Sequence, residues 1–150
     1  MVKLAISYFY RIRFFDRSMI PLSTAVWDPK WYSRNGETYF DSRGVVNGLR
    51  FTHFMPDSTC NNLCHGTSNC SDKPETCAFL QKYSEMLDRL DYDKIMDVLE
   101  NIASNTKSIL KLDCEPTLVF MVYEPPYKPC SERVPLVAWF KVHGYALTEV

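Results

Sequence analysis

The sequence lacks the motifs that most directly assign a chain to a functional class. It contains no glycine-rich phosphate-binding loop, no recognisable catalytic nucleophile–base motif and no Cys-x-x-Cys motif. These absences argue against a P-loop nucleotide site, a complete catalytic set and a thioredoxin-like redox centre. No internal repeat or low-complexity tract is visible either. The motifs therefore do not decide whether the chain is an enzyme.

The chain also lacks an excess of charge of one sign. Its 17 Lys and Arg residues against 18 Asp and Glu residues give a formal net charge of -1. Proteins that hold duplex DNA through bulk electrostatics need a positive excess. The net charge therefore does not support a nucleic acid partner, and any phosphate group must be bound by a local cluster of residues.

No long uninterrupted apolar run occurs near the start of the chain. The segment begins with apolar residues, MVKLAISYFYRIRFFDRSM, but charges from Lys3 to Arg17 interrupt it before a signal-peptide core or a membrane span could form. We therefore expect a cytoplasmic protein without a membrane partner. In a reducing compartment, clustered cysteines are more often metal ligands or reactive thiols than disulfides.

Alternating strand and helix patterns indicate an α/β fold. The 150 residues suit a single domain, 1–150. Short apolar segments predict strands over 3–8 and 20–26, and the run 116–124, PTLVFMVYE, is typical of a buried central strand in a parallel sheet. Helical spacing predicts a first helix over 79–90 and a second that begins at an N-cap, Asp91, and ends at the polar stretch SNTKS. A third helix is predicted over 131–143, and an edge strand follows it in 145–150. Strand, helix and strand in this order imply a parallel crossover.

The middle of the chain, 27–55, is predicted to be irregular. It is rich in aromatic residues, and Asn35-Gly36, Gly44 and Asn47-Gly48 predict the turns of short hairpins. The segment between the first two strands, YRIRFFDRS, fits either a loop or a single helical turn. Thr76 is expected to cap the helix that follows the cysteine-rich segment.

Several of these segments resemble the family catalogued as domain of unknown function 488. The early stretch SYFYRI, the motif PKWY, the strand ending in YEPP and the helix that carries a buried Trp follow the layout of that family. The matching residues are Ser7 and Tyr8, Pro29 to Tyr32, Tyr123 and Glu124, and Trp139. The family's Cys-His-Arg motif falls on Ser131, Glu132 and Arg133, so only the arginine is retained in register, and Cys130 lies one residue earlier.

The resemblance covers nearly the whole chain apart from 56–78, a cysteine-rich segment that has the character of an insertion. It implies a three-layer or Rossmann-like α/β arrangement and no settled activity. We therefore predict a single-domain, three-layer Rossmann-like fold with a mostly parallel sheet and an inserted cysteine-rich metal-binding loop.

Four cysteines in the inserted segment have the spacing C-x3-C-x5-C-x6-C. They are Cys60, Cys64, Cys70 and Cys77. Soft thiolates in this number suit a tetrahedral zinc ion, and His65 could replace one of them. An iron–sulfur cluster is the less favoured metal group, and two disulfides or unconnected thiols are the alternatives without metal. A closed four-cysteine shell leaves no open position, so we expect a structural role for the ion.

The turn between the strand 116–124 and the helix 131–143 is the first candidate ligand site. Ligands of parallel sheets bind beyond the carboxyl ends of strands, and the N-terminus of a helix attracts anions. We expect Ser131 and Arg133 to bind a phosphate or carboxylate, with Glu124 and Cys130 as candidate catalytic residues and Cys130 as the nucleophile. An alternative of equal weight is architectural, in which Ser131 caps the helix and Arg133 pairs with Glu124.

Aromatic and basic residues follow the first two predicted strands. The first strand is followed by Ser7, Tyr8, Tyr10, Arg11 and Arg13, and the second by Trp27, Lys30, Trp31 and Tyr32. If the strands are parallel neighbours, these side chains converge on the sheet edge that carries Glu124 and Arg133. Rings next to arginine can stack on a base and neutralise its phosphate, so we predict that Tyr8, Arg11 and Trp31 contribute to ligand binding. The alternative places the aromatic rings in the core.

Two functional hypotheses follow from these candidate sites. The first is a cytoplasmic α/β protein that binds a phosphorylated or nucleotide-like ligand at the turn 124–133, with hydrolase or transferase chemistry through Glu124. The second is a non-catalytic, zinc-stabilised module that binds a protein or a nucleic acid. A panel of nucleotides and sugar phosphates in a thermal-shift assay separates them, because a ligand of the folded state raises its melting temperature.

Overall fold

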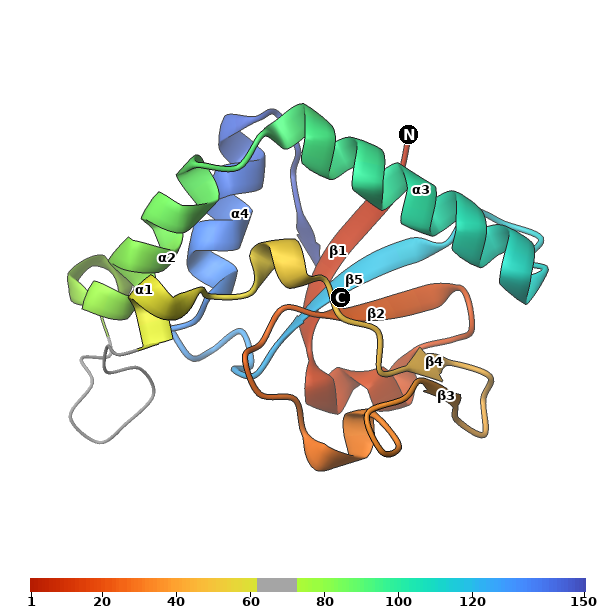
Figure 1. The fold of residues 1–150 in the computed structure, drawn as a ribbon. Coiled ribbons are helices and arrows are strands. Elements are labelled where there is room, and N and C mark those ends of the chain that lie inside the picture. Colours follow the sequence, from red (N-terminus) through yellow and green to blue (C-terminus); the bar gives the residue numbers. More distant parts are fainter. Residues whose placement is uncertain (62–72) are drawn as a thin grey trace.

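The computed structural model describes residues 1–61 and 73–150 of the chain, and its centre is a parallel sheet (Figure 1). Four strands lie in the order β2-β5-β1-β6, and every neighbouring pair is parallel. Their bounds are Lys3–Tyr8 for β1, Met19–Ser23 for β2, Thr117–Val122 for β5 and Thr148–Glu149 for β6. The predicted α/β class and parallel sheet are therefore confirmed, with β5 as an inner strand and β6 at the edge.

The α-helices cover one face of this sheet (Figure 1). They are α1 (Ser58–Asn61), α2 (Ala78–Asp88), α3 (Tyr92–Leu110) and α4 (Arg133–Val142). Side chains alternate across a strand, so Leu4 and Ile6 of β1 and Phe120 of β5 point into this helix layer. There they pack in one cluster with Leu99 of α3 and Phe140 of α4.

Short 3-10 helices and a hairpin cover the opposite face (Figure 1). They are η1 (Phe9–Phe14), η2 (Lys30–Tyr32) and the antiparallel pair β3 (Tyr39–Phe40) and β4 (Val46–Asn47). Ala5, Val119 and Met121 pack here against Phe9 and Tyr32. We call residues 9–50, apart from strand β2, the aromatic layer. In the described residues this layer contains no α-helix, so the finer Rossmann-like prediction stays a prediction.

Two further 3-10 helices, η3 (Thr52–Phe54) and η4 (Pro74–Thr76), lead into the helix layer. The buried hydroxyl of Tyr83 donates to the carbonyl of Phe54 at 2.5 Å and ties η3 to α2.

No helix in the described residues is long and apolar enough to cross a membrane.

The predicted turns and caps are mostly present. Asp91 is the N-cap of α3, and its Oδ1 accepts from the backbone N–H groups of Asp93 and Lys94 at 3.1 and 3.3 Å. Asn35 and Gly36 have positive φ and form a two-residue turn whose flanking residues exchange two backbone hydrogen bonds.

Three boundaries were predicted wrongly. The stretch SNTKS does not end α3, which continues to Leu110 and stops at Lys111 in the left-handed conformation. The second strand ends at Ser23, and the next residue, Thr24, donates both its backbone N–H and its hydroxyl to the carbonyl of Met121. Thr76 donates its hydroxyl to the carbonyl of Lys73, and the N-cap position of α2 belongs to Cys77.

Candidate ligand-binding pocket

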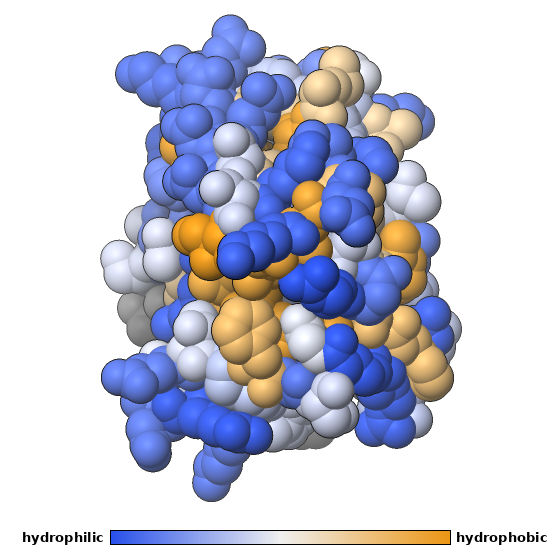
Figure 2. Space-filling model, turned by 90° about the vertical axis from the view of Figure 1, so that its right-hand side faces the viewer, coloured by the Kyte–Doolittle hydropathy of each residue, from blue (hydrophilic) through white to orange (hydrophobic). Residues whose placement is uncertain are grey.

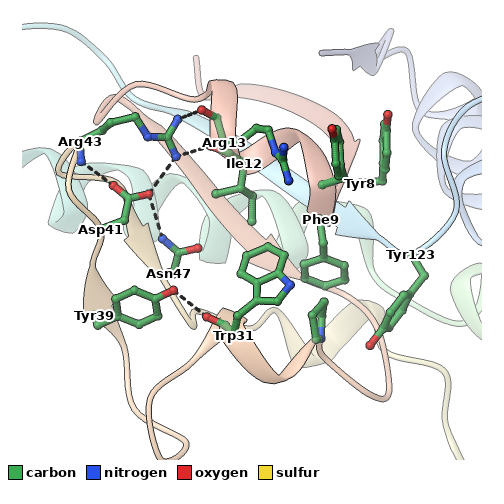
Figure 3. A pocket seen from close by; sticks show the side chains of 12 residues that line it. Tyr8, Phe9, Ile12, Arg13, Trp31, Tyr39, Asp41, Arg43, Asn47 and Tyr123 are labelled. Atoms are coloured by element: carbon green, nitrogen blue, oxygen red, sulfur yellow. Dashed lines mark hydrogen bonds and ion pairs between the residues drawn. The ribbon is translucent and has the colours of Figure 1, made fainter.

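The carboxyl ends of β1 and β5 lie side by side, with Tyr8 opposite Val122. The chain leaves β1 through η1 on the aromatic layer, whereas it leaves β5 through α4 on the helix layer. Neighbouring parallel strands whose connections leave to opposite faces open a crevice between those connections, and α/β proteins bind ligands there. A cavity of about 610 Å³ lies at this crevice (Figure 3). Its lining residues are Tyr8, Phe9, Tyr10, Ile12, Arg13, Pro29, Trp31, Tyr39, Asp41, Arg43, Asn47 and Tyr123.

Aromatic rings make up most of the wall of this pocket. Phe9 is buried and contacts Trp31 and Tyr123 edge to face, with ring centroids 6.4 and 5.3 Å away. The rings of Tyr8 and Tyr10 are stacked at 6.3 Å with an interplanar angle of 12°. Trp31 and Tyr123 are both exposed, so their rings remain accessible to a planar ligand.

The three-residue repeat of η1 determines which of its side chains line the pocket. A 3-10 helix has three residues per turn, so residues three apart share one face. Phe9 and Ile12 form the buried face, whereas Tyr10 and Arg13 are exposed, with the Arg13 guanidinium 3.8 Å from the Tyr10 ring centroid, and both pairs line the pocket. Arg11 therefore lies outside the pocket, on the third face of the helix.

The hairpin side of the pocket is held by an ion pair. Asp41 and Arg43 are 2.9 Å apart, and the Arg43 guanidinium also donates to the carbonyls of Ile12, Arg13 and Phe15. Burial of the Asp41 carboxyl favours its neutral form, but hydrogen bonds from Arg43 and Val45 outweigh burial and lower its pKa. The charge of Arg43 is thus neutralised, whereas Arg13 has no carboxylate partner among the described residues.

Two further polar groups of the wall can select a ligand. The side chain of Asn47 is 1% exposed, and its Nδ2 donates to the Val45 carbonyl at 3.2 Å. Its Oδ1 accepts from no donor in the described residues and lies on the pocket side of the amide, away from Asp41 (Figure 3). Burial raises the pKa of Tyr123, and the Asp28 carboxylate raises it further, so the Tyr123 hydroxyl stays protonated at neutral pH.

The turn 124–133 has a different character. The Arg133 residue is only 8% exposed, and its guanidinium donates to both carboxylate oxygens of Glu149, at 2.6 and 3.3 Å, and to the backbone carbonyl of Glu124 at 2.7 Å. Ser131 is fully buried, and its Oγ accepts from the Arg133 N–H at 3.2 Å. Cys130 is half-buried against the helix layer. This geometry favours the architectural alternative for the turn, with Glu149 as a partner that sequence reasoning missed.

Only two of the four predicted cysteine ligands lie in the described residues. Cys60 and Cys77 are buried in the same core cluster of the helix layer. Burial and the nearby Asp57 carboxylate raise the pKa of the Cys60 thiol. Cys64, His65 and Cys70 lie outside the described residues, and within those residues no three His, Cys, Asp or Glu side chains form a metal site. The zinc site stays a prediction.

The predicted ligand residues thus divide between two places. Tyr8, Tyr10, Arg13 and Trp31 of the expected group line the pocket, together with Asp41 and Asn47, which sequence reasoning did not select. Comparison with family models, with curated proteins and with solved structures found no match for this chain. The resemblance to domain of unknown function 488 therefore stays a prediction, and function has to be argued from the pocket itself.

Proposed function

We propose that the protein binds a nucleotide-like ligand, a planar ring system that carries a phosphate, in the pocket at the ends of β1 and β5. One observation carries this proposal: accessible aromatic rings and the unpaired cation of Arg13 line the crevice where parallel sheets bind ligands. A stacked base contributes about 1–3 kcal/mol per ring, and arginine suits phosphate because it donates in a planar fork.

The polar groups of the wall suit such a ligand. A buried acceptor without a donor destabilises a protein by about 1–3 kcal/mol. Asn47 Oδ1 is such an acceptor in the described residues, and a ligand N–H group would remove the penalty once the side chains that cover Oδ1 move aside. The exocyclic amino group of a base is a donor of this kind. The protonated hydroxyl of Tyr123 can donate to a ligand oxygen. The lining residues include no nucleophile–base pair, so the proposal is binding, without hydrolase or transferase chemistry.

Isothermal titration calorimetry with AMP, adenosine and ribose 5-phosphate tests the proposal. We expect AMP to bind more tightly than either fragment, because only AMP offers both a ring and a phosphate. Trp31→Ala should weaken AMP binding by about 5- to 150-fold, the equivalent of one lost stacking contact. Arg13→Gln should weaken the binding of AMP but leave the binding of adenosine unchanged, because adenosine has no phosphate.

Trp27→Ala is the matched control, because Trp27 is 80% exposed and does not line the pocket. If Trp31→Ala and Trp27→Ala weaken AMP binding equally, or if no nucleotide of a panel binds, the proposal is contradicted.

We also propose, as a separate feature, that Cys60, Cys64, Cys70 and Cys77 bind one structural zinc ion in a reducing compartment such as the cytoplasm. The burial of Cys60 and Cys77 in one cluster supports it, because both ends of the cysteine-rich segment meet the helix layer there. Elemental analysis should find about one zinc per chain, and Cys77→Ser should lose it. A metal-free protein, or iron in place of zinc, would contradict this assignment.

A further inference from the structure

We infer that the pocket is one subsite of a longer surface, built on the aromatic layer, that binds single-stranded nucleic acid. This inference rests on the proposed function, because it takes the nucleotide of the pocket to be one unit of a chain. The surface would receive the neighbouring nucleotides of the same strand on rings and arginines that lie outside the pocket.

The first supporting observation is where the exposed aromatic rings lie. In the described residues all exposed Phe, Tyr and Trp rings fall within 10–40 or in the connection that follows β5, and the outer surfaces of α2, α3 and α4 carry none of these three residue types. They are Tyr10, Phe14, Trp27, Trp31, Phe40, Tyr123 and Tyr127. Exposed rings gathered on one part of a surface indicate a binding site, and bases of a single strand stack on such rings whatever their sequence.

The second observation is the distribution of charge. The aromatic layer, 9–50, contains seven Lys and Arg against four Asp and Glu, a net charge of about +3. Residues 51–150 contain nine against fourteen, a net charge of about -5. Salt screens charges beyond roughly 10 Å, so a polyanion on the aromatic layer interacts mainly with that layer. The negative net charge of the whole chain is therefore compatible with a nucleic acid bound to the aromatic layer.

The third observation is that the arginines of this layer lie against its rings. In the described part of the chain, each cation–π contact falls in the aromatic layer: Arg13 on Tyr10, Arg11 on Phe14 at 4.8 Å and Arg34 on Tyr39 at 4.2 Å. Tyr10 and Tyr39 line the pocket, whereas Arg11 and Phe14 lie on the adjacent face of η1. A single nucleotide in the pocket leaves this second pair uncovered.

The pattern of the surface favours a nucleic acid over a protein partner. On the face that Figure 2 shows, hydrophobic groups form small patches separated by hydrophilic ones. A protein-docking site more often presents one continuous apolar patch, whereas rings interleaved with cations suit alternating bases and phosphates. Duplexes are excluded as the main ligand, because their bases are already stacked on each other and cannot stack on these rings.

Fluorescence anisotropy with labelled single-stranded oligonucleotides, from one to about nine nucleotides, tests the inference. Affinity should rise with length and then level off, and it should fall with salt at about 0.7 log units per log unit for each phosphate contact. Phe14→Ala should weaken the longer oligonucleotides by about 5- to 150-fold and leave AMP binding unchanged, because Phe14 lies outside the pocket.

Arg11→Gln should make the affinity for oligonucleotides less dependent on salt concentration, because it removes one contact to phosphate. Lys141→Gln on α4 is the control, and it should leave this salt dependence unchanged. The melting temperature of each variant checks that it folds. If AMP binds but affinity does not grow with length, or if a duplex binds as well as a single strand, this inference is overturned and the proposed function stands. If neither AMP nor any oligonucleotide binds, both are overturned.

Discussion

The contacts of Arg133 allow a sharp test of whether the turn 124–133 is architecture or a ligand site. Its guanidinium joins α4 to β6 through Glu149 and to the end of β5 through the Glu124 carbonyl. Breaking a buried ion pair destabilises a protein by about 3–5 kcal/mol, but the Glu149 side chain is 32% exposed and regains water when its partner is removed. We therefore expect Arg133→Met to lower the free energy of unfolding by about 2–4 kcal/mol.

Arg133→Lys keeps the charge but replaces the planar fork with a single ammonium group, which cannot reach both acceptors. We expect it to lose about half as much stability as Arg133→Met, roughly 1–2 kcal/mol. Urea unfolding measures both losses, and each kcal/mol should lower the melting temperature by about 2–4 °C. Both variants should bind AMP as the wild type does, because Arg133 does not line the pocket.

Arg89→Met is the matched control, because Arg89 pairs with Asp57 at 3.5 Å while its side chain is 60% exposed. It should change stability by less than about 1 kcal/mol. A double-mutant cycle of Arg133→Met with Glu149→Gln isolates the pair itself. If Arg133→Met leaves urea unfolding unchanged but abolishes AMP binding, the architectural reasoning is refuted and the turn is the ligand site.

Three further predictions concern local features of the fold. Asp91→Ala should lower the free energy of unfolding by about 0.5–2 kcal/mol in urea, whereas Asp91→Asn, which keeps a capping oxygen, should lose little. Because the pKa of Asp41 is lowered on folding, its contribution is present above the unfolded value of 3.8 and is lost as pH falls below it. Wild type and Asp41→Asn should therefore differ in urea unfolding at neutral pH and converge in acid; a constant difference would refute this. Gly48→Ala should lower the free energy of unfolding in urea by about 1–3 kcal/mol, because Gly48 has a φ of +103° and an added Cβ would lie 3.0 Å from Thr38 Cα. Gly144→Ala should lower it less, because at a φ of +87° it carries the backbone strain but its Cβ meets no neighbour.

The parts of the fold that the sequence predicts are those with a local signal. β1 and β5 are continuous apolar runs, and the carboxylate of Asp91 stands directly before an apolar helical stripe. The end of α3 has no such signal, because SNTKS is polar, yet the helix continues through it to Leu110, which packs against the core cluster. The end of β2 likewise has no local signal, because Ala25 and Val26 continue the apolar pattern beyond Ser23.

The candidate site shows the same division between local and distant causes. Tyr8 and Trp31 could be selected because they follow predicted strands at one edge of the sheet. The choice of Arg13 over Arg11 needs the three-residue repeat of η1, and the sequence fits a loop there equally well. Asn47 and Asp41 reach the pocket only through the hairpin fold, about 35 residues after η1 begins, and no pattern near them marks a binding residue.

The two layers of the molecule divide its tasks. The helix layer holds most of the large buried side chains, and the Arg133 pair fastens its last helix to the sheet. The aromatic layer exposes rings and arginines at the carboxyl ends of the strands. Because η1 is both the connection from β1 to β2 and a wall of the pocket, the bonds from Arg43 to its carbonyls fix the pocket and the fold at once. Substitutions on the exposed faces of η1 should therefore change binding with little effect on stability, whereas substitutions at Arg43 should change both.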